Sequence, residues 1–199
     1  MGSVTDGVKT RIASIMLARS SDPERISRRA TWLRQADDRF RHRDRPSKLR
    51  MGGPRPERLT CAAVQMKATL SHSGREYVDL VYRLAAKAAA AGADIVAFPE
   101  YSGLPLLGMI PGMEKILAHA DSLAQAVGPA GDVLEVFRFL GPYADRAYRA
   151  AFSSVSRELG IYIVSGTMVL PDEAGNRNAM RSLGYVFGPE GELCGKYHK

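Results

Sequence analysis

Two side chains with complementary chemistry stand at the ends of apolar, strand-like runs. Glu100 follows Phe98 and Pro99 at the end of one run, and Lys199 ends the segment 195–199, which reads GKYHK. A carboxylate can act as a general base, and a fixed ammonium can stabilise negative charge that develops on oxygen or nitrogen. Loops at the carboxyl ends of strands in an open α/β sheet converge on a crevice where ligands bind, so Glu100 is a candidate site residue, and Lys199 is a second candidate at the end of another strand-like run.

The residue types alone leave other interpretations open. Glu100 could cap a loop or be solvated, and Lys199 could be a solvated lysine at a strand end. Lys196 is an alternative cation three residues earlier. Successive side chains of an extended strand alternate between its faces, so Lys196 and Lys199 are expected on opposite sides and only one can face the crevice.

Hydrophobic periodicity predicts the elements that position these groups. Residues 59–66 and 93–98 are short apolar runs typical of buried strands, and the Ala-rich segment 74–91 between them has an apolar helical face that Gly92 ends. Strand, helix and strand at this spacing predict a βαβ unit with parallel strands. Further along we expect a loop after Glu100, helices over 113–127 and 143–159, a strand over 161–170, and a hairpin of 183–187 and 192–197 around the turn 188–191.

Residues 1–58 differ in charge from the rest of the chain. The net charge is +7, yet residues 1–58 carry 15 Lys and Arg against 7 Asp and Glu, whereas residues 59–199 carry 13 against 14. A near-neutral body argues against nucleic acid as its ligand. Within the basic segment, Asp22, Pro23 and Glu24 predict the start of one amphipathic helix, and prolines and glycines between 46 and 56 predict a linker.

Four interpretations of the basic segment stay open. It can be a helical arm packed on the body or on a second subunit, a solvated tail, or a site for anionic partners. Alternatively residues 1–50 are not translated naturally, because Met51 lies just before the body. We therefore expect two regions, a basic helical arm with linker over 1–58 and a near-neutral globular domain over 59–199.

Composition excludes several classes of protein. No apolar run approaches the roughly 20 residues that cross a bilayer. Cys61 and Cys194 are too few for a disulfide framework, which favours a reducing, cytoplasmic setting. No cofactor motif or metal-ligand cluster occurs, and no Gly-rich phosphate loop follows the first strand, which argues against a Rossmann-like nucleotide binder.

Five short segments in order resemble the nitrilase superfamily of carbon–nitrogen hydrolases, and the resemblance covers Leu59 to Lys199. They are residues 63–66 (AVQM), 91–100 (AGADIVAFPE), 164–167 (VSGT), 188–193 (GPEGEL) and 195–199 (GKYHK). The resemblance implies an α-β-β-α sandwich, of which this chain would supply one sheet and its helices. The N-terminal helical arm, which the resemblance does not cover, would extend that fold. It is an α/β fold, classed as α+β in some schemes.

The resemblance also implies residue roles. Glu100 matches the family's general base, and Lys199, two positions after Tyr197, matches the lysine that stabilises the oxyanion, in preference to Lys196. The family's cysteine nucleophile and a second glutamate would lie beyond Lys199, because neither Cys61 nor Cys194 fits the motif or the order of the nucleophile. Ser182 stands where many members carry asparagine.

The resemblance implies thiol-dependent hydrolysis of a non-peptide C–N bond by the full-length protein, with an amide or carbamoyl substrate favoured over a nitrile. The 199 residues alone are expected to be inactive, and the full-length protein is expected to be a cytoplasmic homo-oligomer without a cofactor, a metal, a membrane or a nucleic-acid partner. The alternative is a non-catalytic binding or scaffold member of the same fold.

Overall fold

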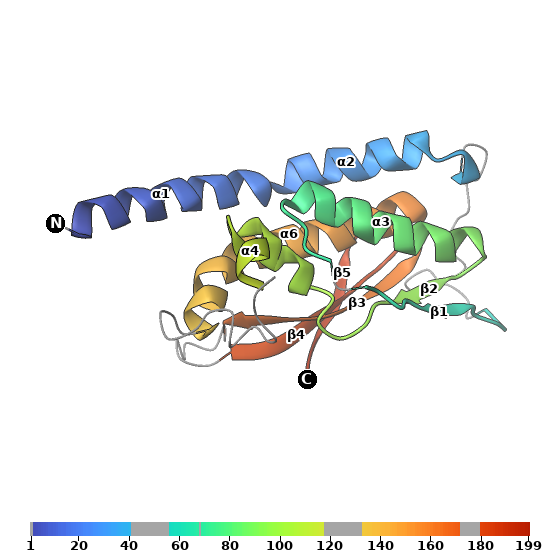
Figure 1. The fold of residues 1–199 in the computed structure, drawn as a ribbon. Helices are drawn as coiled ribbons and strands as arrows, with labels where there is room; N and C mark the ends of the chain where they lie inside the picture. The colour runs from blue at the N-terminus through green and yellow to red at the C-terminus, as the bar shows by residue number, and fades with distance from the viewer. Residues whose placement is uncertain (1, 41–55, 68, 118–132, 172–179) are drawn as a thin grey trace.

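A five-stranded sheet forms the base of the molecule, and helices cover one of its faces (Figure 1). The structure, a computed structural model, describes residues 2–40, 56–67, 69–117, 133–171 and 180–199. Two helices, α3 and α6, lie against the sheet, and α1 and α2 lie on the far side of those helices. The mixed α/β class expected from the sequence is confirmed, with one sheet and its helices present among the described residues.

The sheet has its strands in chain order, with mixed directions. They are β1 (Cys61–Ala63), β2 (Ile95–Ala97), β3 (Tyr162–Pro171), β4 (Met180–Phe187) and β5 (Leu193–His198). The pairs β1–β2 and β2–β3 are parallel, and the pairs β3–β4 and β4–β5 are antiparallel, which confirms the predicted βαβ unit and hairpin. Because β5 consequently runs in the same direction as β2, the carboxyl ends of both strands lie at one edge of the sheet.

Local signals explain the helix α3 (Gly74–Ala90), which joins β1 to β2. The side chain of Ser73 accepts a hydrogen bond from the Glu76 amide at 3.2 Å and caps the first turn, while Gly92 at φ 99° ends the helix as predicted. The second covering helix, α6 (Val133–Leu159), begins ten residues before the predicted Tyr143 and continues through Pro142. Pro142 is exposed, which leaves room for its ring and for water at the carbonyl that lacks an N–H partner.

The segment after Glu100 that was predicted to be a loop contains a 3-10 helix, η2 (Leu104–Met109). The helix α4 (Met113–Leu117) begins where the helix over 113–127 was predicted to begin. The remainder of the helix predicted over 113–127 lies outside the described residues. The turn η2 packs against α3 and α6, α4 packs against η2, and most side chains of η2 are buried.

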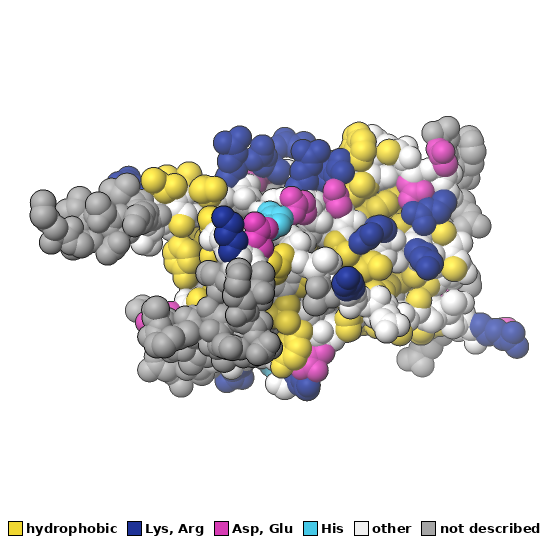
Figure 2. Space-filling view, viewed as in Figure 1, with side chains coloured by type: hydrophobic (Ala, Val, Ile, Leu, Met, Phe, Trp, Pro, Cys, Tyr) yellow, Lys and Arg dark blue, Asp and Glu magenta, His cyan; other side chains and the backbone are white. Residues whose placement is uncertain are grey.

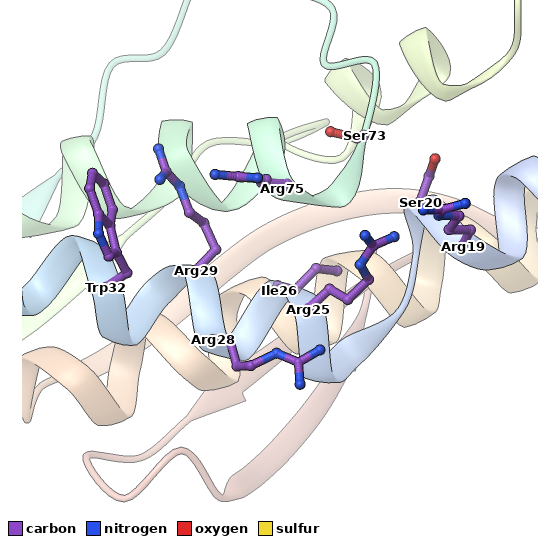
Figure 3. A pocket seen from close by; sticks show the side chains of 9 residues that line it. All are labelled: Arg19, Ser20, Arg25, Ile26, Arg28, Arg29, Trp32, Ser73 and Arg75. Carbon is purple, nitrogen blue, oxygen red and sulfur yellow. The ribbon is translucent and has the colours of Figure 1, made fainter.

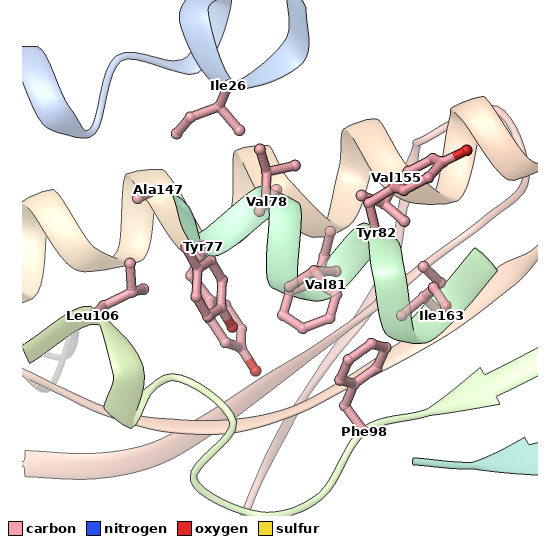
Figure 4. Close-up of a cluster of buried hydrophobic side chains, with 14 of the residues drawn as sticks. Ile26, Tyr77, Val78, Val81, Tyr82, Phe98, Leu106, Ala147, Val155 and Ile163 are labelled. Atoms are coloured by element: carbon pink, nitrogen blue, oxygen red, sulfur yellow. The ribbon is translucent and has the colours of Figure 1, made fainter. Parts of the chain in front are cut away.

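The core lies between the sheet and the two covering helices (Figure 4). Aromatic rings dominate it: Phe98 at the end of β2 packs edge-on against Phe152 of α6, with ring centroids 4.9 Å apart, and Phe152 packs in turn against Tyr148. Val81 of α3 and Ile163 of β3 complete the layer and are fully buried. This packing fixes the position of the carboxyl end of β2, and therefore of Glu100, relative to β3.

The N-terminal arm, α1 (Gly2–Ser20) and α2 (Pro23–Ala36), packs on the body through α2. Asp22 caps α2 by accepting from the Glu24 amide at 2.9 Å, as the sequence predicted. Ile26 and Ala30 are buried to 1% and 0% exposure, and Arg29 binds Asp79 of α3. A short 3-10 helix, η1 (Asp38–Phe40), follows, and the first half of α1 extends beyond the body (Figure 1).

The face of the sheet opposite the helices is partly exposed. Cys61 and Ala63 of the outer strand β1 are exposed on it, because they alternate with Ala62, whose neighbour on β2 is the buried Val96. The linker expected before the body falls largely in 41–55, outside the described residues. Among the helices that the structure describes, none combines the length and the apolar character needed to traverse a bilayer.

Candidate functional site

Glu100 and Lys199 meet at the edge of the sheet. The Nζ atom of Lys199 donates a hydrogen bond to Oε1 of Glu100 at 2.7 Å, although 99 positions separate the two residues in the chain. Glu100 follows β2 and Lys199 follows β5, so each stands at the carboxyl end of its strand. The structure therefore brings together the two residues that the sequence singled out.

The loop that carries Glu100 is held against β3 by hydrogen bonds from residues before and after Glu100 in the chain. The Phe98 amide donates to the carbonyl of Val164 at 2.9 Å, and the Tyr101 amide donates to Oγ1 of Thr167 at 3.1 Å. Tyr101 adopts a positive φ of 57°, which turns the chain sharply after Glu100. Glu100 thus lies on a short, anchored turn, and its backbone position is fixed by β3.

Lys199 is held by β4, the strand that pairs with β3 on the side opposite β2. Its amide donates to the carbonyl of Ser182 at 3.0 Å, which continues the β4–β5 ladder to the last residue. Two residues earlier, the hydroxyl of Tyr197 donates to the carbonyl of Gly166 in β3 at 2.7 Å, crossing over Gly184 of β4. A Cβ on Gly184 would overlap the ring of Tyr197, so only glycine leaves room for this crossing.

A bulge in β3 connects the Glu100 turn with the Lys199 strand. The pairing of β3 with β4 shifts register between Val164 and Thr167, and Gly166 within the shift has φ 74°. A Cβ on Gly166 would overlap the carbonyl oxygen of Pro99, directly before Glu100, and would lie 2.7 Å from Oγ of Ser102. The bulge therefore lets the backbone of the Glu100 turn approach β3 closely.

A buried polar network supports the bulge from the helix side. Hydroxyl groups of Ser102 and Tyr148 each reach the carbonyl of Ser165 at 2.6 Å, and the Tyr77 hydroxyl donates to the carbonyl of Ser102 at 3.0 Å. Burial raises the pKa of the Tyr148 hydroxyl, so it remains a neutral donor. Sequence reasoning missed these supporting residues, although Gly166 within a strand-like run is the usual sign of a bulge or a close backbone contact.

The ion pair sets the protonation of both groups. The hydrogen bond from Lys199 holds the pKa of the Glu100 carboxyl below its ordinary value, and the carboxylate in turn raises the pKa of Lys199. The side chains are 38% and 62% exposed, respectively. A carboxylate that acts as a general base often has a pKa raised by desolvation, whereas the pKa of Glu100 in this chain is lowered.

This assignment predicts how Glu100 titrates. Because its pKa is lowered in the folded chain, the pair is intact at neutral pH and breaks as the pH falls through that lowered pKa. Replacing Lys199 with methionine removes the main cause of the shift, so the pKa of Glu100 is expected to rise toward its ordinary value. Carbon-detected NMR titration of the Glu100 carboxyl measures this directly. Lys196→Met is the matched control, and an equal change with that variant would contradict the assignment.

Neither cysteine lies at the carboxyl ends of the strands, where Glu100 and Lys199 form their ion pair. Cys61 is the first residue of β1 and Cys194 the second of β5, so both lie toward the amino ends of strands that run parallel to β2. Burial, followed by the carboxylate of Glu192, raises the pKa of the Cys194 thiol, which disfavours the reactive thiolate. Across the described ranges, no group of three or more His, Cys, Asp and Glu side chains is arranged to hold a metal ion.

Comparison with solved structures finds, among others, an amidase from Nesterenkonia sp. and a carbon–nitrogen hydrolase from Helicobacter pylori G27. The amidase is 19% identical over 70% of this chain, with a TM-score of 0.42, and the Helicobacter protein is 17% identical over 69%, with a TM-score of 0.45. This chain spans 41% and 38% of their respective lengths. Comparison with curated proteins returns no match.

A comparison with protein-family profiles matches the part of the chain that contains the five nitrilase-like segments. The sequence profile described as "Carbon-nitrogen hydrolase" matches residues 60–199, from the start of β1 to the lysine of the ion pair. That range contains every segment on which the nitrilase resemblance rests and leaves the arm outside, so the resemblance is confirmed and the chain belongs to the carbon–nitrogen hydrolase family.

Proposed function

We propose that the protein hydrolyses a non-peptide C–N bond of a small molecule, an amide or a carbamoyl group rather than a nitrile, through a thiol nucleophile. Membership of the carbon–nitrogen hydrolase family supports the reaction class. The observation that carries the assignment of roles is the 2.7 Å contact between Glu100 and Lys199, two groups from distant parts of the chain. In this proposal the protein works in the cytoplasm as a homo-oligomer and needs no cofactor.

Each residue of the pair has one task in the proposed reaction. Glu100 takes the proton of the thiol, and the resulting thiolate adds to the carbonyl carbon of the substrate. Lys199 stabilises the oxyanion: its ammonium has three N–H donors, of which one binds Glu100, so others remain for the substrate oxygen. Glu100 then returns the proton to the departing amine, the C–N bond breaks, and water hydrolyses the thioester.

The thiol in this scheme is neither Cys61 nor Cys194, because both lie toward the other end of their strands. We propose that it belongs to sequence outside these 199 residues, and that the 199 residues alone have no hydrolase activity. Protein that brings the thiol to the pair also covers it from water. Desolvation raises the pKa of a carboxyl group, which would offset the lowering by Lys199 and bring Glu100 closer to the range of an effective base.

Ammonia release tests the proposal. The protein that contains this chain together with its flanking sequence is assayed against a short aliphatic amide, an N-carbamoyl amino acid and an aliphatic nitrile, and intact mass is recorded during turnover. We expect ammonia from the amide or the carbamoyl compound, an acyl adduct on one cysteine, and complete inhibition by a thiol-alkylating reagent. Substrate binding without turnover or adduct would instead support the non-catalytic alternative.

A further inference from the structure

An arginine-lined cavity lies where the N-terminal arm meets the first turn of α3 (Figure 3). Its volume is about 650 Å³, and its lining is Arg19, Ser20, Arg25, Ile26, Arg28, Arg29, Trp32, Ser73 and Arg75. The space-filling view shows Lys and Arg side chains gathered over this part of the molecule (Figure 2). The cavity shares no lining residue with the Glu100–Lys199 pair.

The walls of the cavity are fixed by packing at the α1–α2 junction. A Cβ on Gly74 would lie 2.5 Å from Cδ1 of Ile26 and 2.7 Å from the carbonyl oxygen of Ser20, so the start of α3 touches the junction directly. The guanidinium of Arg146 in α6 donates to the hydroxyl of Ser21 at 2.8 and 3.1 Å. The lining residues on α1, α2 and α3 are therefore held at a defined separation.

The cavity carries positive charge that the described residues do not neutralise. Five of its nine lining residues are arginines and none is a carboxylate. Arg29 binds Asp79 at 2.7 and 2.8 Å, but within the described ranges no carboxylate forms an ion pair with the other four. Ser73 and Arg75, at the N-terminus of α3, line the same space, where the helix dipole favours negative charge, although the Glu76 amide is already capped by Ser73.

The shape of the cavity and the surrounding charges favour a compact anion. Guanidinium groups match phosphate oxygens in bidentate geometry, and several of them together suit a group with more than one negative charge. A volume of about 650 Å³ lies within the range of small-molecule sites. Glu24 and Glu76 stand next to Arg25 and Arg75 in sequence and interrupt the positive surface, which disfavours the continuous basic path that a nucleic-acid backbone follows.

We propose that the cavity between the α1–α2 junction and the first turn of α3 binds a small phosphorylated compound, with Arg25 and Arg75 as its principal anion ligands. Figure 3 shows Arg25 rising from α2 beside the junction and Arg75 extending along α3 toward Arg29. Trp32 ends the cavity, with the Arg29 guanidinium 4.2 Å above its ring. Ser20 and Ser73 add hydroxyl groups to the same space.

Trp32 gives a direct readout because it is the only tryptophan of the chain, is 54% exposed and lines the cavity. Tripolyphosphate is titrated into the 199-residue protein at an ionic strength of about 0.15 M, with sodium chloride of equal ionic strength as the reference. We expect a saturable change in Trp32 fluorescence with half-saturation below about 1 mM, absent in the chloride reference. The melting temperature is expected to rise with tripolyphosphate.

Matched variants locate the site. Arg25→Gln/Arg75→Gln is expected to weaken binding at least about tenfold, because it removes two charge-assisted donors. It relieves repulsion between like charges, so the ligand-free variant is expected to melt no lower than the wild type. Arg11→Gln/Arg83→Gln removes the same charge from exposed residues outside the cavity lining and is expected to bind normally. The single change Arg25→Gln repeats the test with less perturbation.

Three outcomes would overturn the proposal. One is equal weakening by both double variants, which means nonspecific charge attraction. Another is the absence of a saturable response to tripolyphosphate while vesicles of phosphatidylcholine with phosphatidylglycerol bind, which means a lipid surface. The third is tight binding of a single-stranded oligonucleotide without competition from tripolyphosphate. None of these measurements uses hydrolase activity, so the result is independent of the proposed reaction.

Discussion

Replacing Glu100 with glutamine is expected to lower kcat/KM of the complete protein by about 10²–10⁴-fold, the contribution typical of a general base. Glutamine has the same shape and its carbonyl oxygen can still accept the hydrogen bond of Lys199, but an amide cannot take the proton of a thiol. Initial rates of ammonia release against the best substrate of the panel measure the loss. Because exposed ion pairs contribute little to stability, the melting temperature is expected to change little.

A matched control separates loss of the base from loss of charge. Glu190→Gln removes an exposed carboxylate in the turn between β4 and β5 and is expected to leave the rate unchanged. Adding Lys199→Met to Glu100→Gln is expected to reduce the rate by much less than the product of the two single effects, since the groups act on one transition state. A loss of less than about tenfold for Glu100→Gln would show that another group removes the proton.

Replacing Gly166 with alanine is expected to destabilise the folded protein by about 2–5 kcal/mol, a large share of the total stability of a typical domain. Two effects add. A residue with a side chain is strained at φ 74°, and its Cβ would overlap the carbonyl oxygen of Pro99. Relief of that overlap has to move the turn that carries Glu100 or the strand β3 itself, so activity is expected to fall along with stability.

Urea unfolding measures the first effect as a fall in the midpoint at unchanged slope. Gly195→Ala in β5 is the matched control, because a Cβ there meets no atom within 4 Å and its φ is not positive. We expect that variant to unfold close to the wild-type midpoint. Equal midpoints for Gly166→Ala and Gly195→Ala would mean that the bulge tolerates a side chain and does not constrain the Glu100 turn.

Local signals in the sequence predicted much of the fold, and the family resemblance selected both members of the ion pair. Ser73 and Gly92 mark the ends of α3 within one residue of the predicted range, because capping depends on residues next to each other in the chain. The hairpin of β4 and β5 was predicted for the same reason. The predicted start of α6 at Tyr143 was wrong. Proline usually breaks a helix, but Pro142 lies on the exposed side of α6, where the helix continues past it.

Contacts between distant segments could not be predicted in the same way. The sequence places Tyr197 two residues before Lys199, but nothing in it indicates that the Tyr197 hydroxyl reaches the carbonyl of Gly166, 31 positions away. The pKa of Glu100 was likewise outside sequence reasoning, since it depends on how much water reaches the carboxylate and on the position of one ammonium. Residue types indicate which chemistry is available, whereas packing decides the protonation state.

The arm has a consequence for the order in which the chain folds during synthesis. Arg29 binds Asp79, 50 positions later, and the Thr31 hydroxyl binds Glu158, 127 positions later. Helix α2 therefore leaves the ribosome well before the surface on which it docks has been made. At roughly 5–20 residues per second, about 6 to 25 seconds pass between the synthesis of Thr31 and that of Glu158. Docking of α2 is consequently a late, non-local step of folding, although α2 lies at the start of the chain.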